Sequence, residues 1–139
     1  MEFNWPIRVY IEDTDAGGIV FYVNYLKFME RARTEFLRHI GFDHAAMINQ
    51  GGMFVVHSTN IRYLVPASLD NELIVTVGIG ELRRTHLTFN QSIVRKKDNQ
   101  LLSRADVKVA CVTRESMRPQ VIPNKMKDAL MKFFKTGGN

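Results

Sequence analysis

The stretch EDTDAGGIVFYVNYLKFMERAR, from Glu12 to Arg33, places two carboxylates and a glycine pair directly before the most clearly helical segment of the chain. From Asn24 onward, apolar residues, among them Phe28, Met29 and Phe36, recur at i, i+3 and i+4 while charged residues occupy the other faces, and this is the pattern of an amphipathic helix. Asn24 can cap its start and Gly41 can end it. We therefore expect a helix of roughly 16–18 residues, long enough to lie across a sheet.

The segments around this helix alternate apolar and polar residues as half-buried strands do. One such segment precedes the helix, at residues 6–11, and four follow it, at residues 53–64, 72–82, 85–96 and 101–113. Two shorter helices are expected, one capped by Asp43 and running through Asn49, and one at residues 123–135 with a proline in its first turn. Strands joined by short turns pair antiparallel, so we predict an α+β fold in one domain, residues 1–139, with the long helix covering one face of the sheet.

The composition is that of an ordinary globular protein, with 45% hydrophobic and 24% charged residues. No apolar run approaches the ~20 residues that span a membrane, and the N-terminus MEFNWPIRVY lacks the basic and apolar regions of a signal peptide. The single cysteine, Cys111, excludes an internal disulfide and is expected to be a small buried residue. Together these features predict a cytoplasmic protein.

The formal net charge of +5 and the pI of 9.6 suit an anionic partner. Nucleic acid, anionic lipid, an acidic carrier protein and a phosphorylated cofactor are such partners, and a merely solvated basic surface is the simpler alternative. Scattered basic residues without a recognised binding motif argue against nucleic acid. Arg83 and Arg84, at a predicted turn, could grip a phosphate or could simply be solvated.

Asp15 is the residue for which we predict a chemical role. Threonine and alanine flank it, and no basic side chain is near it in sequence. In a partly buried pocket, Asp15 would therefore stay basic enough to activate water or to attack a carbonyl. The simpler interpretation is that Asp15 opens a glycine turn. Asp13 is expected to be a structural acceptor at the end of the strand.

The start of the predicted helix can supply the second half of such a site. Unpaired N–H groups and the partial positive charge of a helix N-terminus suit the oxygen of a reacting carbonyl. Tyr22 could point into the same site, although an aromatic residue in an apolar stretch is more often part of the core. The four histidines show no metal-ligand spacing, so we expect no metal site. Motifs of serine hydrolases, kinases and NAD-dependent enzymes do not occur in the sequence.

Taken together, these residues resemble the hot-dog-fold thioesterases, in particular the YbgC-type (Tol-Pal-associated) acyl-CoA thioesterases and the related 4-hydroxybenzoyl-CoA thioesterases. The opening signature of that family is matched by Arg8-Val9-Tyr10 and by the run from Glu12 to Val20. The resemblance continues, more loosely toward the end, through Asn24-Tyr25-Leu26, the run from Phe28 to Glu35, Tyr63, Pro66-Ala67 and Asp70. It covers nearly the whole chain.

The resemblance implies a curved, five-stranded antiparallel sheet wrapped around one long central helix. It also implies that Asp15 is the catalytic carboxylate and that the backbone N–H of Tyr22 polarises a thioester carbonyl. The YbgC-type branch usually carries a histidine at this position and the hydroxybenzoyl branch a tyrosine, so no imidazole role is carried over to Tyr22. Arg83 and Arg84 could hold the phosphates of CoA.

The function implied is hydrolysis of a short-chain, long-chain or aromatic acyl-CoA, or of an acyl-carrier-protein thioester. No cofactor is implied, because the CoA thioester is the substrate, and the family forms dimers or tetramers with active sites at the subunit interface. The alternative is a weakly active scaffold that holds acyl carrier protein or lipid-synthesis enzymes at the cell envelope, with peripheral contact to the inner membrane. A hot-dog dehydratase is less favoured, because those enzymes generally need a catalytic histidine and this segment has none.

Overall fold

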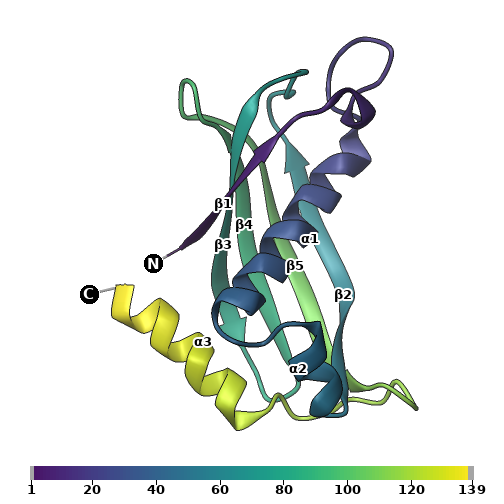
Figure 1. Ribbon diagram of the computed structural model, residues 1–139, viewed down its shortest axis with the longest axis vertical. Helices are drawn as coiled ribbons and strands as arrows, with labels where there is room; N and C mark the ends of the chain where they lie inside the picture. The colour runs from purple at the N-terminus through teal and green to yellow at the C-terminus, as the bar shows by residue number, and fades with distance from the viewer. Residues whose placement is uncertain (1, 138–139) are drawn as a thin grey trace.

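A computed structural model describes residues 2–137 of the chain. The elements follow in the order β1 (Phe3–Arg8), the short 3-10 helix η1 (Ile11–Asp13), α1 (Tyr22–His39), α2 (His44–Asn49), β2 (Gly52–Tyr63), β3 (Glu72–Leu82), β4 (His86–Arg95), β5 (Gln100–Thr113) and α3 (Asn124–Gly137) (Figure 1). This order of one strand, a long helix, a short helix, four strands and a terminal helix confirms the predicted α+β class.

The five strands form one antiparallel sheet in the order β1-β3-β4-β5-β2, so β1 and β2 lie at its edges. Pro6 lies in β1, and an edge strand tolerates the missing backbone N–H of proline. β2 pairs with β5 from Gly52–Thr113 to Tyr63–Ser103, with an irregularity of register after Val56. The other long side of β2 faces no strand among residues 2–137.

The first strand is shifted from its predicted position at residues 6–11. The chain leaves β1 after Arg8, and the N–H groups of Asp13 and Thr14 donate back to the carbonyls of Tyr10 and Ile11 at 3.0 Å. These short-range hydrogen bonds wind residues 11–13 into η1, which brings two carboxylate residues to the end of the sheet.

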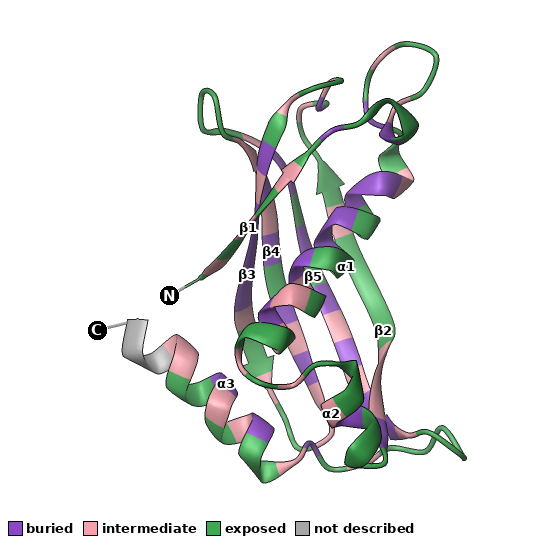
Figure 2. Cartoon of the chain, in the orientation of Figure 1, coloured by how far each residue is buried: buried purple, intermediate pink, exposed green. Residues whose placement is uncertain are grey.

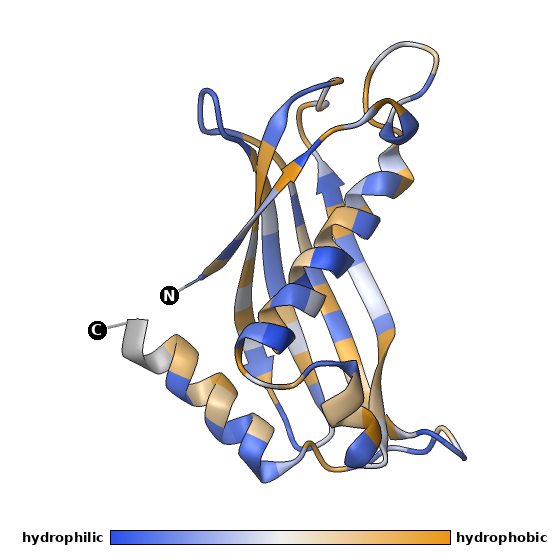
Figure 3. Cartoon of the chain, in the orientation of Figure 1, coloured by the Kyte–Doolittle hydropathy of each residue, from blue (hydrophilic) through white to orange (hydrophobic). Residues whose placement is uncertain are grey.

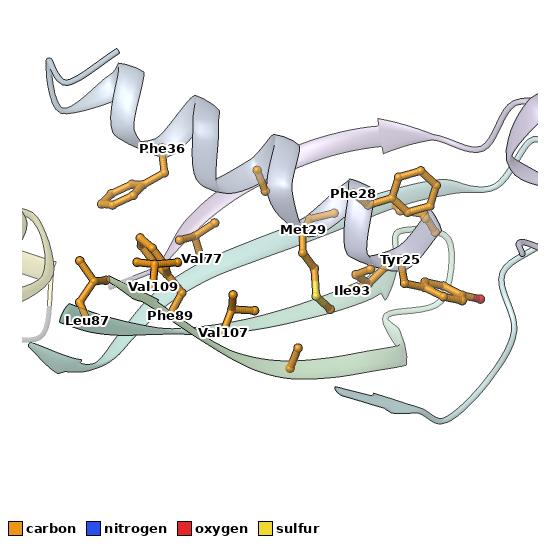
Figure 4. Packing of buried hydrophobic residues seen from close by; sticks show 14 of the residues in the cluster. Tyr25, Phe28, Met29, Phe36, Val77, Leu87, Phe89, Ile93, Val107 and Val109 are labelled. Carbon is orange, nitrogen blue, oxygen red and sulfur yellow. The ribbon is translucent and has the colours of Figure 1, made fainter. Parts of the chain in front are cut away.

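α1 lies along one face of the sheet and forms the core with it (Figures 1 and 4). Its buried face carries the residues that the periodicity predicted, among them Phe28, Met29 and Phe36. They pack against the inward-facing residues of the strands, such as Phe89 and Val107. Burial therefore runs as a stripe along α1 and in alternation along the strands (Figure 2).

The opposite face of the sheet is polar. Alternation along β5 buries Ala105, Val107 and Val109 under α1, while Arg104 and Asp106 are exposed on the other side. Figure 3 shows the resulting change between hydrophobic and hydrophilic residues along the strands. The helix-covered face and the adjoining ends of the strands therefore hold the apolar surfaces of the molecule.

The end of α1 confirms one prediction and its start corrects another. Gly41 has φ = +93°, its N–H donates to the Arg38 carbonyl and the N–H of Phe42 donates to the Leu37 carbonyl, as in a Schellman motif. Asn24 is not the N-cap, however, because α1 already begins at Tyr22. The segment before the helix is held instead by the Phe21 N–H, which donates to the Asp13 carbonyl at 2.9 Å.

The remaining helices match their predictions closely. Asp43 caps α2, since its carboxylate accepts from the Ala46 N–H at 2.9 Å. α3 begins directly after Pro123 and buries Met126 and Leu130. Cys111 is fully buried, and burial raises the pKa of its thiol. In the described part of the chain, no helix combines the length and apolarity needed to cross a membrane.

Candidate active site

Asp15 lies in the short hairpin that joins η1 to α1 (Figure 1). Its backbone N–H donates to the Ile19 carbonyl and its carbonyl accepts from the Gly18 N–H, both at 3.0 Å. Its carboxylate Oδ1 accepts from the Gly17 N–H at 2.8 Å. Gly18 has φ = +81°, the left-handed backbone that this turn requires. Asp15 thus opens the glycine turn, as the simpler interpretation held.

The carboxylate of Asp15 is nevertheless available for chemistry. In the single chain Asp15 is exposed, so one chain alone does not form the partly buried pocket on which its basicity was made conditional. Neither the ion pairs nor the other hydrogen bonds of the described residues occupy its second oxygen, Oδ2. One oxygen is therefore oriented by the turn while the other stays free.

Asp13 has the structural role that we predicted, and the contacts show what it holds. It is 4% exposed. Its Oδ2 accepts from the Tyr10 N–H and its Oδ1 from the side-chain amide of Asn24, both at 2.9 Å. Because Asn24 lies in the first turn of α1, the Asp13 carboxylate ties the Asp15 hairpin to the helix start.

The N-terminus of α1 is open. Phe21 occupies the N-cap position without a capping side chain, and the first turn has no acidic residue. The first N–H groups of a helix have no partner within it, and those of Tyr22 and Val23 donate to no other backbone group of the described residues, so they remain available as donors. The helix dipole adds a partial positive charge at the same place. This end can bind a carbonyl oxygen that gains negative charge.

Three tyrosines gather at this helix start. The side chain of Tyr22 is 59% exposed, so the expectation that it belongs to the core is wrong. Its ring lies edge-on to Tyr63, with centroids 6.0 Å apart, and Tyr63 lies 5.5 Å from Tyr25. The hydroxyl of Tyr25 accepts from the Ala67 N–H at 2.9 Å. Burial raises the pKa of both Tyr25 and Tyr63, and the neighbouring tyrosines raise that of Tyr63 further.

Sequence reasoning had not placed Tyr63 in the site. From the sequence, Tyr63 was known only as one of the residues of the family resemblance and as a residue near the end of a predicted strand. Neither feature reveals a contact between residues 22 and 63, because that contact depends on how the far end of β2 meets the helix start.

Arg83 and Arg84 lie at the other end of the sheet. They follow β3, whose eleven residues extend roughly 35 Å from the end near Asp15. Arg83 pairs with Glu81 and thereby lowers the pKa of that carboxyl. Arg84 makes no ion pair with the described residues, and its carbonyl accepts from the Ile122 N–H at 3.0 Å. The two arginines and Asp15 therefore do not meet within one chain.

A cavity of about 460 Å³ lies between α1, α2 and β2, toward the same end as the arginines. Arg33 lines it, and burial lowers the pKa of its guanidinium. Arg33 donates to Gln91 at 2.9 Å, and Gln91 donates to the Met29 carbonyl at 3.1 Å. Sequence reasoning did not anticipate this pair. Within residues 2–137, no three His, Cys, Asp or Glu side chains gather as metal ligands do.

Comparisons with known proteins identify the family of this chain. The model of the thioesterase-like superfamily matches residues 9–130. Acyl-CoA thioester hydrolase YbgC of Escherichia coli O6:H1 is 44% identical over 124 residues, which are 89% of this chain and 92% of that protein. Acyl-CoA thioesterase YbgC of Haemophilus influenzae is 42% identical over 128 residues, 91% of this chain and 93% of that protein.

A solved structure shows the same fold. The crystal structure of a probable thioesterase from Bartonella henselae has a TM-score of 0.82 at 32% identity, and the match covers 88% of this chain and 100% of that one. An antiparallel sheet with one long helix along it defines the hot-dog class, as the resemblance implied. The chain belongs to the thioesterase-like superfamily, and within it to the family of the YbgC acyl-CoA thioesterases.

Proposed function

We propose that the protein hydrolyses acyl-CoA thioesters at the end of the sheet where Asp15 meets the start of α1. The observation that supports this function best is a carboxylate with one free oxygen, held by a hairpin next to an uncapped helix N-terminus. Membership of a thioesterase family gives the reaction class.

In this proposal the thioester carbonyl oxygen accepts a hydrogen bond from the Tyr22 N–H. A donor of this kind stabilises the developing oxyanion by about 2.7–4 kcal/mol in known enzymes. Only the backbone of Tyr22 takes part in this contact, so a tyrosine can occupy the position at which the resemblance implies a histidine in the YbgC-type branch. The hydrogen bond from the Asn24 amide to Asp13 holds the helix start, with this donor, at a fixed position relative to the hairpin of Asp15.

Two routes lead from this arrangement to the same products. In one, Asp15 attacks the thioester carbon, the C–S bond breaks to release the CoA thiolate, and water then hydrolyses the mixed anhydride. In the other, Asp15 takes a proton from a water molecule that attacks the carbon directly. Each route yields the carboxylic acid and free CoA. The thiolate is a good leaving group, so neither route needs a strong general acid.

We also propose that the working unit is a homo-oligomer built on β2. This strand has twelve residues, no strand within residues 2–137 pairs with its outer side, and Val56 is 54% exposed. A second copy that pairs its β2 antiparallel would continue the sheet and cover this surface.

Because the two β2 strands would run in opposite directions, opposite ends of the two sheets would lie side by side. The partner's turn with Arg83 and Arg84 would then lie at the same end as Asp15, and its positive charge could attract the CoA phosphates. Arg84 is the stronger candidate, because Arg83 already pairs with Glu81. This gives the predicted phosphate contacts a geometry that one chain alone does not offer.

The proposed reaction is tested by thiol release from acyl-CoAs with purified wild type, Asp15→Asn and Glu12→Gln. Glu12 is an exposed carboxylate on η1, so its amide variant is a matched control and should keep wild-type turnover. Asp15→Asn should lose it. The net charge of +5 also suits an acidic carrier protein, so acyl-carrier-protein thioesters belong in the panel. Carrier binding without hydrolysis of any thioester would favour a scaffold role.

A further inference from the structure

A polar pocket of about 510 Å³ lies on the outer face of the sheet, the face that α1 does not cover. Its exposed lining residues are Asn60, Arg62, Asn90, Arg104 and Asp106. Arg62 directly precedes Tyr63, and successive residues of a strand point to opposite faces of the sheet. Arg62 therefore points away from Tyr63 and from the helix start beside Asp15, so the pocket is separate from the candidate active site.

Two arginines lie directly opposite one another in this pocket. Arg62 of β2 and Arg104 of β5 are partners in the antiparallel register, and the Cβ atoms of such a pair are about 4.5–5.5 Å apart. Neither guanidinium makes an ion pair with a described residue. Like charges in opposite positions destabilise a sheet. The fold thus holds two positive charges together and leaves both of them free to bind an anion.

The carboxylate of the pocket, Asp106, is bound by an amide. With its amide oriented to suit both neighbours, Asn90 donates to Asp106 Oδ1 at 2.8 Å and accepts from the Gly80 N–H at 3.2 Å. A Cβ at Gly80 would come within 2.7 Å of the Asn90 side chain, so the glycine makes room for this contact. Glu2, another carboxylate of this face, lies beside Gly78 and does not line the pocket.

The charges around the pocket suit a doubly negative group. Lys108 follows Arg104 and Asp106 on the outer face of β5 at intervals of two residues. With Arg62, three cations face one carboxylate, which leaves two positive charges. A carboxylate ligand would neutralise one of them, whereas a phosphate group carries about −1.5 to −2 charges at pH 7. The planar fork of arginine also matches the oxygens of a phosphate group.

We propose that Arg62 and Arg104 form a phosphate-binding site on the outer face of the sheet, with the Asn60 amide as a further donor. A phosphate group bridges the two guanidinium groups and removes their mutual repulsion. It belongs either to a soluble phosphorylated compound or to the headgroup of an anionic lipid, since both present the same chemistry. The site is independent of the proposed thioester hydrolysis and of Arg83 and Arg84, which lie at the other end of the sheet.

The test is a titration with inorganic phosphate at constant ionic strength, followed by NMR through the Nε–Hε signals of the arginine side chains. The signals of Arg62 and Arg104 should shift with a common Kd, while that of Arg31, an exposed arginine on α1, should not shift. Arg62→Gln should raise the Kd measured at Arg104 about tenfold or more, because hydrogen bonds between charged groups are lost. Arg31→Gln and Arg84→Gln are controls and should leave this Kd unchanged.

A second experiment identifies the source of the phosphate group. Co-sedimentation is measured with vesicles of phosphatidylcholine, with and without phosphatidic acid, for wild type and for the Arg62→Gln/Arg104→Gln double variant. If phosphatidic acid recruits the wild type and not the double variant, the group is a lipid headgroup. If free phosphate binds in the titration and vesicles recruit nothing through these arginines, it belongs to a soluble compound. Either result supports the site.

Four outcomes would overturn the inference. Two of them are an absence of binding in both experiments and an unchanged Kd at Arg104 in Arg62→Gln. The third is a loss of phosphate binding in Arg84→Gln, which would place the anion at the other end of the sheet. The fourth is a changed oligomeric state of the double variant in size-exclusion chromatography, which would show that the arginines contact a second copy. None of these readouts is thioester hydrolysis, so this site and the proposed function fail separately.

Discussion

Two carboxylates that lie two residues apart should respond to substitution in opposite ways. Asp13 is 4% exposed and accepts hydrogen bonds from the Tyr10 N–H and the Asn24 amide. Asp15 is exposed, and among the described residues its carboxylate bonds only to the Gly17 N–H of its own turn. We predict that Asp13→Ala lowers the free energy of unfolding strongly, whereas Asp15→Ala lowers activity with little effect on stability.

The size of the first effect follows from the contacts. Asp13→Ala removes two hydrogen bonds to a carboxylate and leaves the part-buried Tyr10 N–H and the buried Asn24 amide without these partners. Hydrogen bonds to charged groups contribute about 1.5–3 kcal/mol each, so the expected loss is about 3–6 kcal/mol, a large share of the stability of a small domain. Asp15→Ala should change the free energy of unfolding by less than about 1 kcal/mol, as exposed substitutions usually do.

Urea unfolding followed by circular dichroism measures both losses. Asn24→Ala and the Asp13→Ala/Asn24→Ala double variant complete a cycle that isolates the Asp13–Asn24 pair. A coupling energy of about 1–2 kcal/mol is expected. A loss below about 1 kcal/mol for Asp13→Ala, or a larger loss for Asp15→Ala, would refute the division of roles between the two carboxylates.

Three further predictions concern the scaffold. Phe36 is fully buried and packs against Phe3, Phe89, Phe133 and Phe134, so Phe36→Ala should reduce the free energy of unfolding by about 3–5 kcal/mol; a loss below 1 kcal/mol in urea unfolding would argue against this core. Gly41→Ala forces a side chain onto a backbone with φ = +93° and should reduce stability by about 1 kcal/mol, visible as a lower Tm; an unchanged Tm would contradict the left-handed helix end. Burial raises the pKa of the Cys111 thiol, which keeps it protonated at pH 8, so a thiol reagent should label the native chain far more slowly than the unfolded chain; equal rates would show that Cys111 is accessible.

Most of the scaffold could be predicted from the sequence, because the spacing of apolar residues and the residues that begin or end helices are local signals. The spacing of Phe28, Met29 and Phe36 identified the buried face of α1, and Gly41 and Asp43 marked one helix end and the next helix start. Alternation assigned the buried faces of the strands in the same way. These patterns need no knowledge of how distant segments meet.

Predictions that depended on distant contacts were less complete. Asn24 fits an N-cap by residue type, but the Asp13 carboxylate engages its amide and α1 starts two residues earlier. Tyr22 reads as a core residue in an apolar run, and its exposure follows from its place at the very end of the helix. The contact of Tyr22 with Tyr63 and the separation of Asp15 from Arg83 and Arg84 both follow from the sheet order, which local patterns do not encode.

The central claim is that the Asp15 carboxylate performs the chemistry beside the α1 N-terminus. The most direct measurement is kcat for Asp15→Asn on the best acyl-CoA substrate, with the affinity for CoA measured in parallel by calorimetry. We predict that kcat falls by about 10²–10⁴-fold, as expected when a general base or nucleophile is removed, while CoA binding changes by less than about threefold. A kcat within tenfold of wild type, with CoA binding intact, would contradict the assignment of Asp15.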